Sequence, residues 1–187
     1  MISKILRTLV GLSIAAIGTL VPKSATAADY NATWKNYADE TFCLGNTSGN
    51  QATAGSSLWI HTCNGSLAQT WTDTSYPYLN YELLYTDAAP PPYGGSRCAY
   101  TSGQSNGAGV YLEQCNNTAP WAWLPVYAFN DSNGHPCYYF ESLYGGGNGG
   151  APPIRVFGVS GGNLADGTHV ILWDFLPTHP DQYWCRY

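Results

Sequence analysis

The sequence has few charged residues and very few basic ones. Only 10% of its 187 residues are charged, and twelve acidic residues outnumber seven basic ones. Beyond residue 27 the basic residues are Lys35, Arg97, Arg155 and Arg186 alone. A chain so poor in positive charge is ill suited to neutralising phosphates or anionic lipid headgroups. We therefore expect neither a nucleic acid nor a membrane as its partner.

Long apolar runs are absent except at the N-terminus. Residues 8–21 form one such run after Lys4 and Arg7, and a small-x-small pattern follows at residues 25–27. This arrangement is typical of a signal peptide, and the run is short for a membrane span of about 20 residues. We expect a signal peptide over residues 1–27 and a secreted (extracellular) domain over residues 28–187. A retained membrane anchor is the alternative.

Motifs of the common catalytic and metal sites are also missing. There is no G-x-S-x-G, no H-E-x-x-H and no phosphate-binding loop. The four histidines lack the spacing of a zinc site. Asp39 and Glu40 are adjacent carboxylates, which more often form a solvated loop, and carboxylates paired in space stay open because sequence distance does not give spatial distance. We expect no enzyme, no metal and no cofactor.

Apolar residues after the leader show no convincing 3.6-residue period, which argues against helices. Instead the chain carries 21 glycines, 15 tyrosines and 7 tryptophans, a composition that favours short strands joined by turns. The expected fold class is therefore all-β.

A threefold repeat is the main feature that the sequence does have. Three similar segments, each a turn followed by an apolar strand, end at Cys63, Cys115 and Phe175. A tryptophan follows each by eight or nine residues: Trp71, Trp123 and Trp184. We predict three units of about four strands each, over residues 37–85, 86–144 and 145–187. Units that cannot bury an apolar face alone can together close a barrel without free strand edges.

These units resemble the ricin B-type lectin repeat, in which Cys-Leu, a Gly-bearing turn, an apolar strand and a Q-x-W motif follow one another. Residues 43–71 fit it well, and residues 156–184 fit it with Val156 and Phe175 in place of both cysteines. In residues 98–123, Trp121 stands where the glutamine should be. The resemblance covers nearly all of the chain beyond the leader. It implies a β-trefoil of three four-stranded repeats, stabilised by disulfides.

Six cysteines, all beyond the leader, are typical of an oxidising compartment and allow 15 pairings. The resemblance implies two disulfides within repeats, Cys43–Cys63 and Cys98–Cys115. Cys137 and Cys185 then remain, and we expect them to pair and to hold the C-terminal tail on the barrel. The family pattern does not supply this third bond.

The Q-x-W motifs have a structural interpretation. A tryptophan is a large apolar anchor whose full burial contributes on the order of 2–3 kcal/mol. Gln69 and Gln182 can satisfy backbone groups that a turn leaves unpaired. Residues that bind a ligand are therefore to be sought around these motifs.

The resemblance also implies where sugar would bind. Each family pocket combines an Asp two residues after the first Cys, a polar residue four before the second Cys, an aromatic two before it, and an Asn ahead of Q-x-W. Here the Asp position is Gly45, Tyr100 and Gly158, so no unit supplies that carboxylate. The polar position holds Trp59, Tyr111 and Ile171 in the three units. The aromatic position holds His61, Glu113 and Trp173, and the Asn position holds Ala68, Pro120 and Asp181.

The third unit comes closest to a working pocket. Trp173 would be the platform for the C–H face of a sugar, and Asp181, Gln182 and Asp166 would bind its hydroxyls. The alternatives are a packed strand tryptophan and an aspartate that serves its turn. In the first unit, His61 and Asn64 are candidates, against a polar loop with Trp59 in the core. In the second we expect no pocket and a solvated Glu113.

The leading hypothesis is a secreted glycan- or polysaccharide-binding module with partly degenerate pockets. The alternative is a degenerate trefoil that binds a protein partner through exposed aromatic loops. The missing Asp favours the alternative unless Asp181 or Asp166 takes its place.

Overall fold

The computed structural model describes residues 29–76, 81–88, 97–144 and 153–187. The predicted signal peptide lies outside these ranges. Within them the chain forms thirteen short strands and four 3-10 turns, and no α-helix is present. The described residues therefore contain no helix that is long and apolar enough to cross a bilayer.

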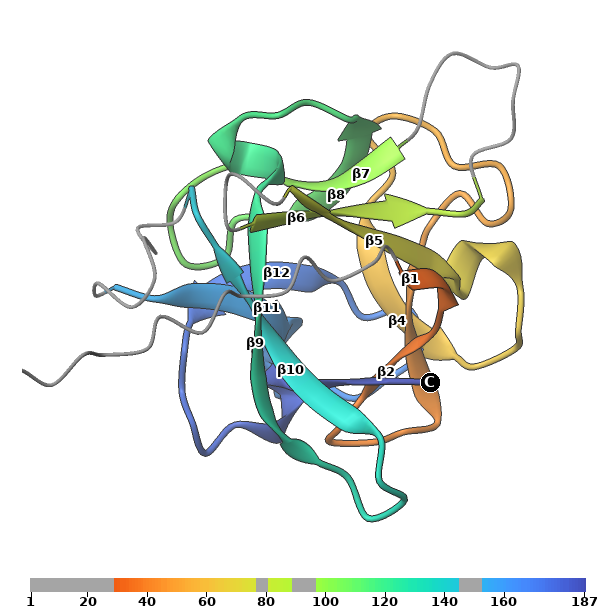
Figure 1. The fold of residues 1–187 in the computed structure, drawn as a ribbon, viewed down its shortest axis with the longest axis vertical. Helices are drawn as coiled ribbons and strands as arrows, with labels where there is room; N and C mark the ends of the chain where they lie inside the picture. The colour runs from red at the N-terminus through yellow and green to blue at the C-terminus, as the bar shows by residue number, and fades with distance from the viewer. Residues whose placement is uncertain (1–28, 77–80, 89–96, 145–152) are drawn as a thin grey trace, which may run out of the picture.

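Strands from both ends of the chain close a barrel (Figure 1). Its order is β5-β6-β9-β10-β13-β2, and β1, which directly precedes β2 in the chain, pairs with β5 to complete the ring. All pairings are antiparallel. The barrel strands are β1 (Asp29–Ala32), β2 (Trp34–Asn36), β5 (Trp71–Tyr76), β6 (Tyr81–Thr86), β9 (Trp123–Asn130), β10 (Pro136–Ser142) and β13 (Trp184–Arg186).

Three hairpins extend from this barrel. Each joins two five-residue strands in continuous antiparallel register. They are β3 (Phe42–Asn46) with β4 (Leu58–Thr62), β7 (Arg97–Thr101) with β8 (Val110–Gln114), and β11 (Arg155–Val159) with β12 (Val170–Asp174). A six-position barrel with three hairpins in threefold arrangement is a β-trefoil, so the predicted fold class is confirmed.

The predicted unit boundaries fall at the C-terminal ends of β6 and β10. With these boundaries, each of the first two units holds four strands, a hairpin and the two barrel strands that follow it: β3 to β6 and β7 to β10. The last unit holds β11, β12 and β13, and the barrel strand that would complete it is supplied by the N-terminal β1–β2 segment. The repeat is thus closed by the meeting of the two chain ends.

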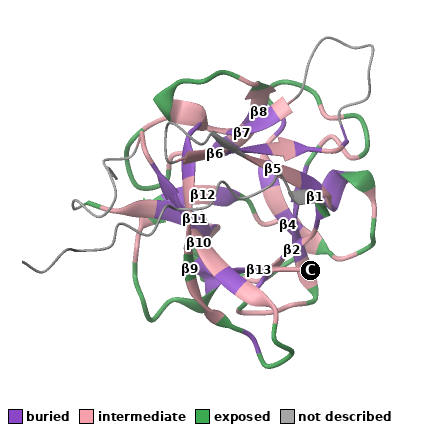
Figure 2. Ribbon diagram, in the orientation of Figure 1, coloured by how far each residue is buried: buried purple, intermediate pink, exposed green. Residues whose placement is uncertain are grey.

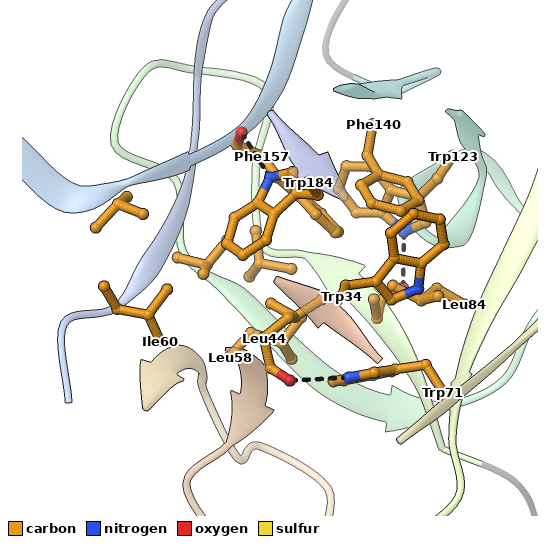
Figure 3. Close-up of a cluster of buried hydrophobic side chains, with 14 of the residues drawn as sticks. Trp34, Leu44, Leu58, Ile60, Trp71, Leu84, Trp123, Phe140, Phe157 and Trp184 are labelled. Atoms are coloured by element: carbon orange, nitrogen blue, oxygen red, sulfur yellow. Dashed lines mark hydrogen bonds between the residues drawn. The ribbon is translucent and has the colours of Figure 1, made fainter. Parts of the chain in front are cut away.

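Exposed residues gather in the connecting loops, whereas the strands carry the buried ones (Figure 2). The three repeat tryptophans lie in the core with no exposed surface (Figure 3). Each indole Nε1 donates to a carbonyl on the first strand of its own hairpin: Trp71 to Leu44 at 3.0 Å, Trp123 to Ala99 at 3.0 Å, and Trp184 to Phe157 at 3.5 Å. Each ring therefore links the hairpin to the barrel strand that follows it. The structural interpretation of these tryptophans is confirmed.

The three predicted disulfides are present, and the described residues contain no free cysteine. Cys43–Cys63 and Cys98–Cys115 each join the two strands of one hairpin. Cys137–Cys185 links β10 to β13, where these two residues are direct partners in the ladder. It holds the last strand on the barrel.

The third hairpin lacks a disulfide and is packed instead. Val156 replaces the first cysteine and has no exposed surface. Phe175 replaces the second and stacks on Tyr139 of β10, with ring centroids 4.2 Å apart and an interplanar angle of 27°. Tyr183 meets Phe175 edge-on. Aromatic contacts to the barrel thus stabilise this hairpin where the others have a covalent bond.

Candidate functional site

The loops of the three hairpins join in a ring at one end of the barrel. In each loop a backbone N–H donates to the second strand of the next hairpin: Gly55 to Leu112, Gly107 to Leu172 and Gly167 to Ile60, at 2.8–2.9 Å. Leu112, Leu172 and Ile60 donate back to Ser56, Ala108 and Thr168. Side chains in one hairpin loop are therefore placed beside the next unit, and a site can draw residues from both.

Trp173 is the most exposed tryptophan described, with 41% of its surface accessible. In the hairpin, Trp173 of β12 pairs with Val156 of β11. Two positions further along β11, Gly158 pairs with Ile171 of β12. Because side chains on facing strands share a face, Trp173 and Gly158 are diagonal neighbours on the outer face. The core face carries Phe157 and Leu172, both fully buried.

Gln182 and Asp181 both lie beside Gly158. A Cβ built on Gly158 would meet Gln182 Cγ at 3.5 Å, Gln182 Nε2 at 3.6 Å and Asp181 Oδ2 at 3.7 Å, all ordinary contact distances. That oxygen accepts the N–H of Val159 at 3.3 Å. Oδ1 lies 3.7 Å from Nδ1 of His179, whose side chain is 54% exposed. A carboxylate from the loop before β13 therefore lies near the position where the third unit lacks its Asp.

Asp181 sits in the 3-10 turn η4 (Pro180–Gln182), which fixes its position. Its carbonyl accepts a hydrogen bond from the side chain of Asn36 at 2.9 Å, so the turn is tied to β2. The side chain of Asp181 is only 13% exposed. Asp181 can therefore present Oδ1 to a ligand beside His179, while its Oδ2 accepts the hydrogen bond from Val159 of the hairpin.

Gln182 is a predicted ligand contact, but both of its polar atoms make hydrogen bonds within the protein. Its Oε1 accepts the N–H of Leu176 at 2.8 Å, and its Nε2 donates to the carbonyl of Asp174 at 2.9 Å. The residue is 2% exposed. Gln182 thus shapes the loop that carries Asp181 and is almost fully withdrawn from solvent.

Asp166 lies beside the first unit, away from the position expected for it. Its Oδ1 accepts the N–H of Thr62 at 2.7 Å and contacts Nδ1 of His61. The hydrogen bond from Thr62, aided by His61, holds the pKa of Asp166 below its usual value. Asp166 is placed beside the first unit because the next residue, Gly167, donates its N–H to Ile60 of β4 in the ring of hairpin loops.

His61 and Trp59 stack on the outer face of β4, with centroids 5.2 Å apart and an interplanar angle of 22°. Trp59 is half-buried and is not part of the core cluster, which answers the alternative that placed it there. A Cβ on Gly45 would lie 3.3 Å from Trp59 Nε1. In this unit an indole therefore covers the position where the family has Asp.

Asn64 is exposed and serves its own turn. Its side-chain oxygen accepts the N–H of Ser66 at 2.9 Å, and its backbone N–H donates to Gln69 Oε1 at 2.8 Å. Both of these polar groups are thus engaged within residues 64–69.

The second unit shows aromatic packing at its equivalent positions. Tyr100, at the Asp position, contacts Trp121, at the Gln position, with centroids 4.6 Å apart. Tyr111 lies over Gly109, where a Cβ would fall 2.5 Å from its hydroxyl oxygen. Glu113 is half-buried. These rings cover the surface that a pocket would need.

Outside the hairpins, one cluster of ligating groups occurs among the described residues: Glu40, Asp131 and Cys185. Cys185 is bonded to Cys137 and has no thiolate to offer. Asp131 already accepts hydrogen bonds from Asn133, His135 and Tyr187. The cluster is a hydrogen-bonded anchor for Tyr187, and its donor set does not fit a metal ion.

His179 is the residue at the third site that motif reasoning missed. A signal was present, since it lies two residues before Asp181, and residues flanking a short Pro-containing turn project from the same loop.

No family model and no curated protein matches this chain. Solved structures share its fold. A designed threefold-symmetric protein, ThreeFoil, superposes with a TM-score of 0.67 at 15% identity, over 83% of this chain and 96% of its own. The Rhizoctonia solani agglutinin gives 0.60 at 16% identity, over 85% and 96%. An exo-β-1,3-galactanase from Clostridium thermocellum gives 0.63 at 16%, over 84% of this chain and 29% of that one.

At these identities the likeness shows the fold alone. The class that topology and comparisons define together is a disulfide-stabilised β-trefoil.

Proposed function

We propose that this chain is a secreted glycan-binding module that follows a signal peptide over residues 1–27, and that its third unit binds sugar. The observation that carries the proposal is the carboxylate of Asp181, whose Oδ2 lies beside Gly158 in the hairpin that exposes Trp173. The fold shared with an agglutinin supports it. Three disulfides are typical of proteins that fold in an oxidising compartment, which supports secretion.

The geometry suits a pyranose ring. Its apolar C–H face would pack on the exposed indole of Trp173, and its hydroxyls would donate to the outer oxygen of Asp181 in charge-assisted hydrogen bonds. His179, beside that oxygen, would complete the polar edge. No step of this function is catalytic. A single exposed site of this kind binds weakly, so avidity would come from several sites or copies.

The alternative is a scaffold that binds a protein partner. The observation that favours it is a run of contacting rings on the barrel side, in which Phe129 joins Tyr37 and Tyr183 at 4.7 and 5.2 Å. Tyr37 is 40% exposed. Aromatic side chains are enriched at protein interfaces. This surface does not involve Trp173, so the two functions are separable by substitution.

A glycan array probed with the secreted protein tests the proposal. We expect wild type to bind a subset of glycans, and we expect Trp173→Ala and Asp181→Asn to lose about tenfold or more of that binding. Tyr127→Ala is the matched control, because Tyr127 is 57% exposed and lies on β9 away from the hairpins. Binding that survives Trp173→Ala refutes the site, and wild type that binds no glycan refutes the lectin function.

A further inference from the structure

The chain contains four Asn-Gly pairs, at residues 64–65, 106–107, 133–134 and 148–149, and the last lies outside the described residues. In such a pair the backbone nitrogen of glycine can attack the asparagine Cγ, because no Cβ on the glycine hinders its approach. In a folded protein, the attacking N–H and the side-chain amide must also be free to meet. The asparagines of the three described pairs are all exposed, so exposure does not distinguish them. Their hydrogen bonds do.

At Asn106–Gly107 both reacting groups are engaged. The N–H of Gly107 donates to the carbonyl of Leu172 at 2.8 Å, as part of the ring of hairpin loops. The side chain of Asn106 is held by Asp174: its Nδ2 donates to Asp174 Oδ2 at 2.8 Å, and its oxygen accepts the N–H of Asp174 at 2.9 Å. An attack by Gly107 on Asn106 would therefore have to break contacts that join two hairpins.

Asn133–Gly134 is held by the turn between β9 and β10. The N–H of Gly134 donates to the carbonyl of Asp131 at 3.1 Å, and the N–H of Asn133 donates to Asp131 Oδ1 at 2.8 Å. The Asn133 side chain interacts with the Tyr187 hydroxyl. The attacking nitrogen and the side-chain amide of this pair are thus both engaged as well.

Asn64–Gly65 differs from both pairs. Within the described residues, neither the N–H of Gly65 nor Nδ2 of Asn64 makes a hydrogen bond. Asn64 Oδ1 accepts the N–H of Ser66 at 2.9 Å, and a donor at this oxygen stabilises the negative charge that develops there when Cγ is attacked. No atom lies within 4 Å of the place where a Cβ on Gly65 would be, so the surroundings leave room for the rearrangement.

We propose that Asn64 is a site of spontaneous deamidation, at which the folded protein converts this residue to a mixture of aspartate and isoaspartate. The nitrogen of Gly65 forms a bond to Asn64 Cγ, and the bond from Cγ to Nδ2 breaks. Nδ2 leaves as ammonia, taking the proton of the Gly65 N–H. The cyclic succinimide that results takes up one water molecule. Opening at Cγ gives aspartate, and opening at the main-chain carbonyl gives isoaspartate.

The modification changes the chain in two ways, and it is independent of the proposed glycan binding. A neutral amide becomes a carboxylate, so the modified chain carries one more negative charge and separates from its parent on an anion exchanger. Isoaspartate also lengthens the main chain by one atom, in the loop that Gln69 fixes through the N–H of Asn64. The fraction of modified chains therefore records how long the protein has existed.

The experiment incubates the folded protein, with its disulfides intact, in warm and mildly alkaline buffer, and follows each Asn-Gly pair by peptide mass mapping. We expect Asn64 to react about tenfold or more faster than Asn106 and Asn133, since hydrogen bonds must break first at those two. The same protein, reduced and unfolded in urea, is the control. There the three pairs should react at similar rates, because they are the same dipeptide.

Two variants of Ser66 test the part played by its N–H. Ser66→Pro removes the donor at a residue whose φ of −76° suits proline, and it should slow the reaction of Asn64 several-fold. Ser66→Ala keeps the N–H and should react like wild type. In the folded wild type, an Asn64 that reacts no faster than Asn106 and Asn133, or that yields aspartate without isoaspartate, overturns the proposal. A Ser66→Pro variant as fast as Ser66→Ala overturns the role of the Ser66 N–H.

Discussion

Gln69 holds the loop that leads from the first hairpin back to the barrel. Its Nε2 donates to the carbonyls of His61 and Thr62 at 3.3 and 3.0 Å, and its Oε1 accepts the N–H of Asn64 at 2.8 Å. Gln182 makes equivalent bonds in the third unit. In the second, Trp121 takes this position and packs on Tyr100. The same loop is thus held by an amide in two units and by ring packing in one.

Gln69→Ala should lower the free energy of unfolding by about 2–3 kcal/mol, because it removes three hydrogen bonds of a buried side chain at about 1 kcal/mol each. Urea unfolding followed by tryptophan fluorescence measures this. Thr70→Ala is the control, because it removes only the exposed hydrogen bond from the Thr70 hydroxyl to the carbonyl of Leu67, three residues earlier. It should lower the free energy of unfolding by no more than about 0.5 kcal/mol. Equal costs for the two variants would contradict the role given to Gln69.

The hairpins depend on one another through their loops. Gly55, Gly107 and Gly167 hold φ of 82°, 85° and 83°, and each donates its N–H to the next hairpin. The left-handed region is costly for any residue with a Cβ. Glycine at this position therefore allows each loop to turn its N–H toward its neighbour, and the ring of three hairpins closes.

Gly107→Ala should destabilise the fold by about 1–2 kcal/mol through backbone conformation alone, since no atom lies within 4 Å of the added Cβ. Gly103→Ala in the same loop is the matched control. Its Cβ would meet only Ala108 at 3.5 Å, an ordinary contact, and its φ lies outside the left-handed region. Urea unfolding of both variants tests the difference, and a Gly107→Ala variant as stable as Gly103→Ala contradicts it.

At the scale of the whole molecule, the barrel is closed by its two ends. Thr33 and Tyr187 exchange two backbone hydrogen bonds, and β13 pairs with β2 over three residues (Figure 1). The Tyr187 hydroxyl lies 2.6 Å from Asp131 and 2.9 Å from Glu40, and Lys35 sits over its ring. The last residue is therefore anchored by side-chain chemistry as well as by the Cys137–Cys185 bond.

This anchor predicts a dependence of stability on pH. Burial opposes the charged form of Asp131, but hydrogen bonds from Tyr187, His135 and Asn133 outweigh it and hold its pKa well below the usual value. Burial and the hydrogen bonds to Asp131 and Glu40 raise the pKa of Tyr187 well above 10. The stability contributed by Asp131 is complete above its unfolded pKa near 4 and falls as pH drops below it. That of Tyr187 is complete below pH 10 and falls above it.

Tyr187→Phe should therefore lower the melting temperature by a few degrees at pH 7 and flatten the loss of stability at both extremes of pH. Thermal unfolding from about pH 2 to pH 11 measures it. Tyr127→Phe is the control, because its hydroxyl makes only an exposed contact to Asn130 at 3.4 Å. A pH profile of Tyr187→Phe parallel to that of wild type would contradict the anchor.

The sequence by itself determined the fold class, the threefold repeat and the three disulfides. Composition indicates the fold class, and the recurrence of cysteines and tryptophans indicates the repeat. The resemblance to the ricin B-type repeat implies two of the disulfides, and the third joins the two cysteines that remain. The burial of Trp71, Trp123 and Trp184 belongs here too, since a repeated large apolar residue has only the common core to fill.

Only the tertiary structure decided which residues meet. Asp166 lies 105 residues from His61 in the chain and contacts it because the hairpin loops join in a ring. Asp181 lies beside Gly158 because η4 packs against β11, where the N–H of Val159 donates to its Oδ2. Gln182 is withdrawn from solvent by backbone groups of its own loop. The motif positions specify residue types within one unit, whereas the carboxylates near both candidate sites are placed by packing between segments distant in the chain.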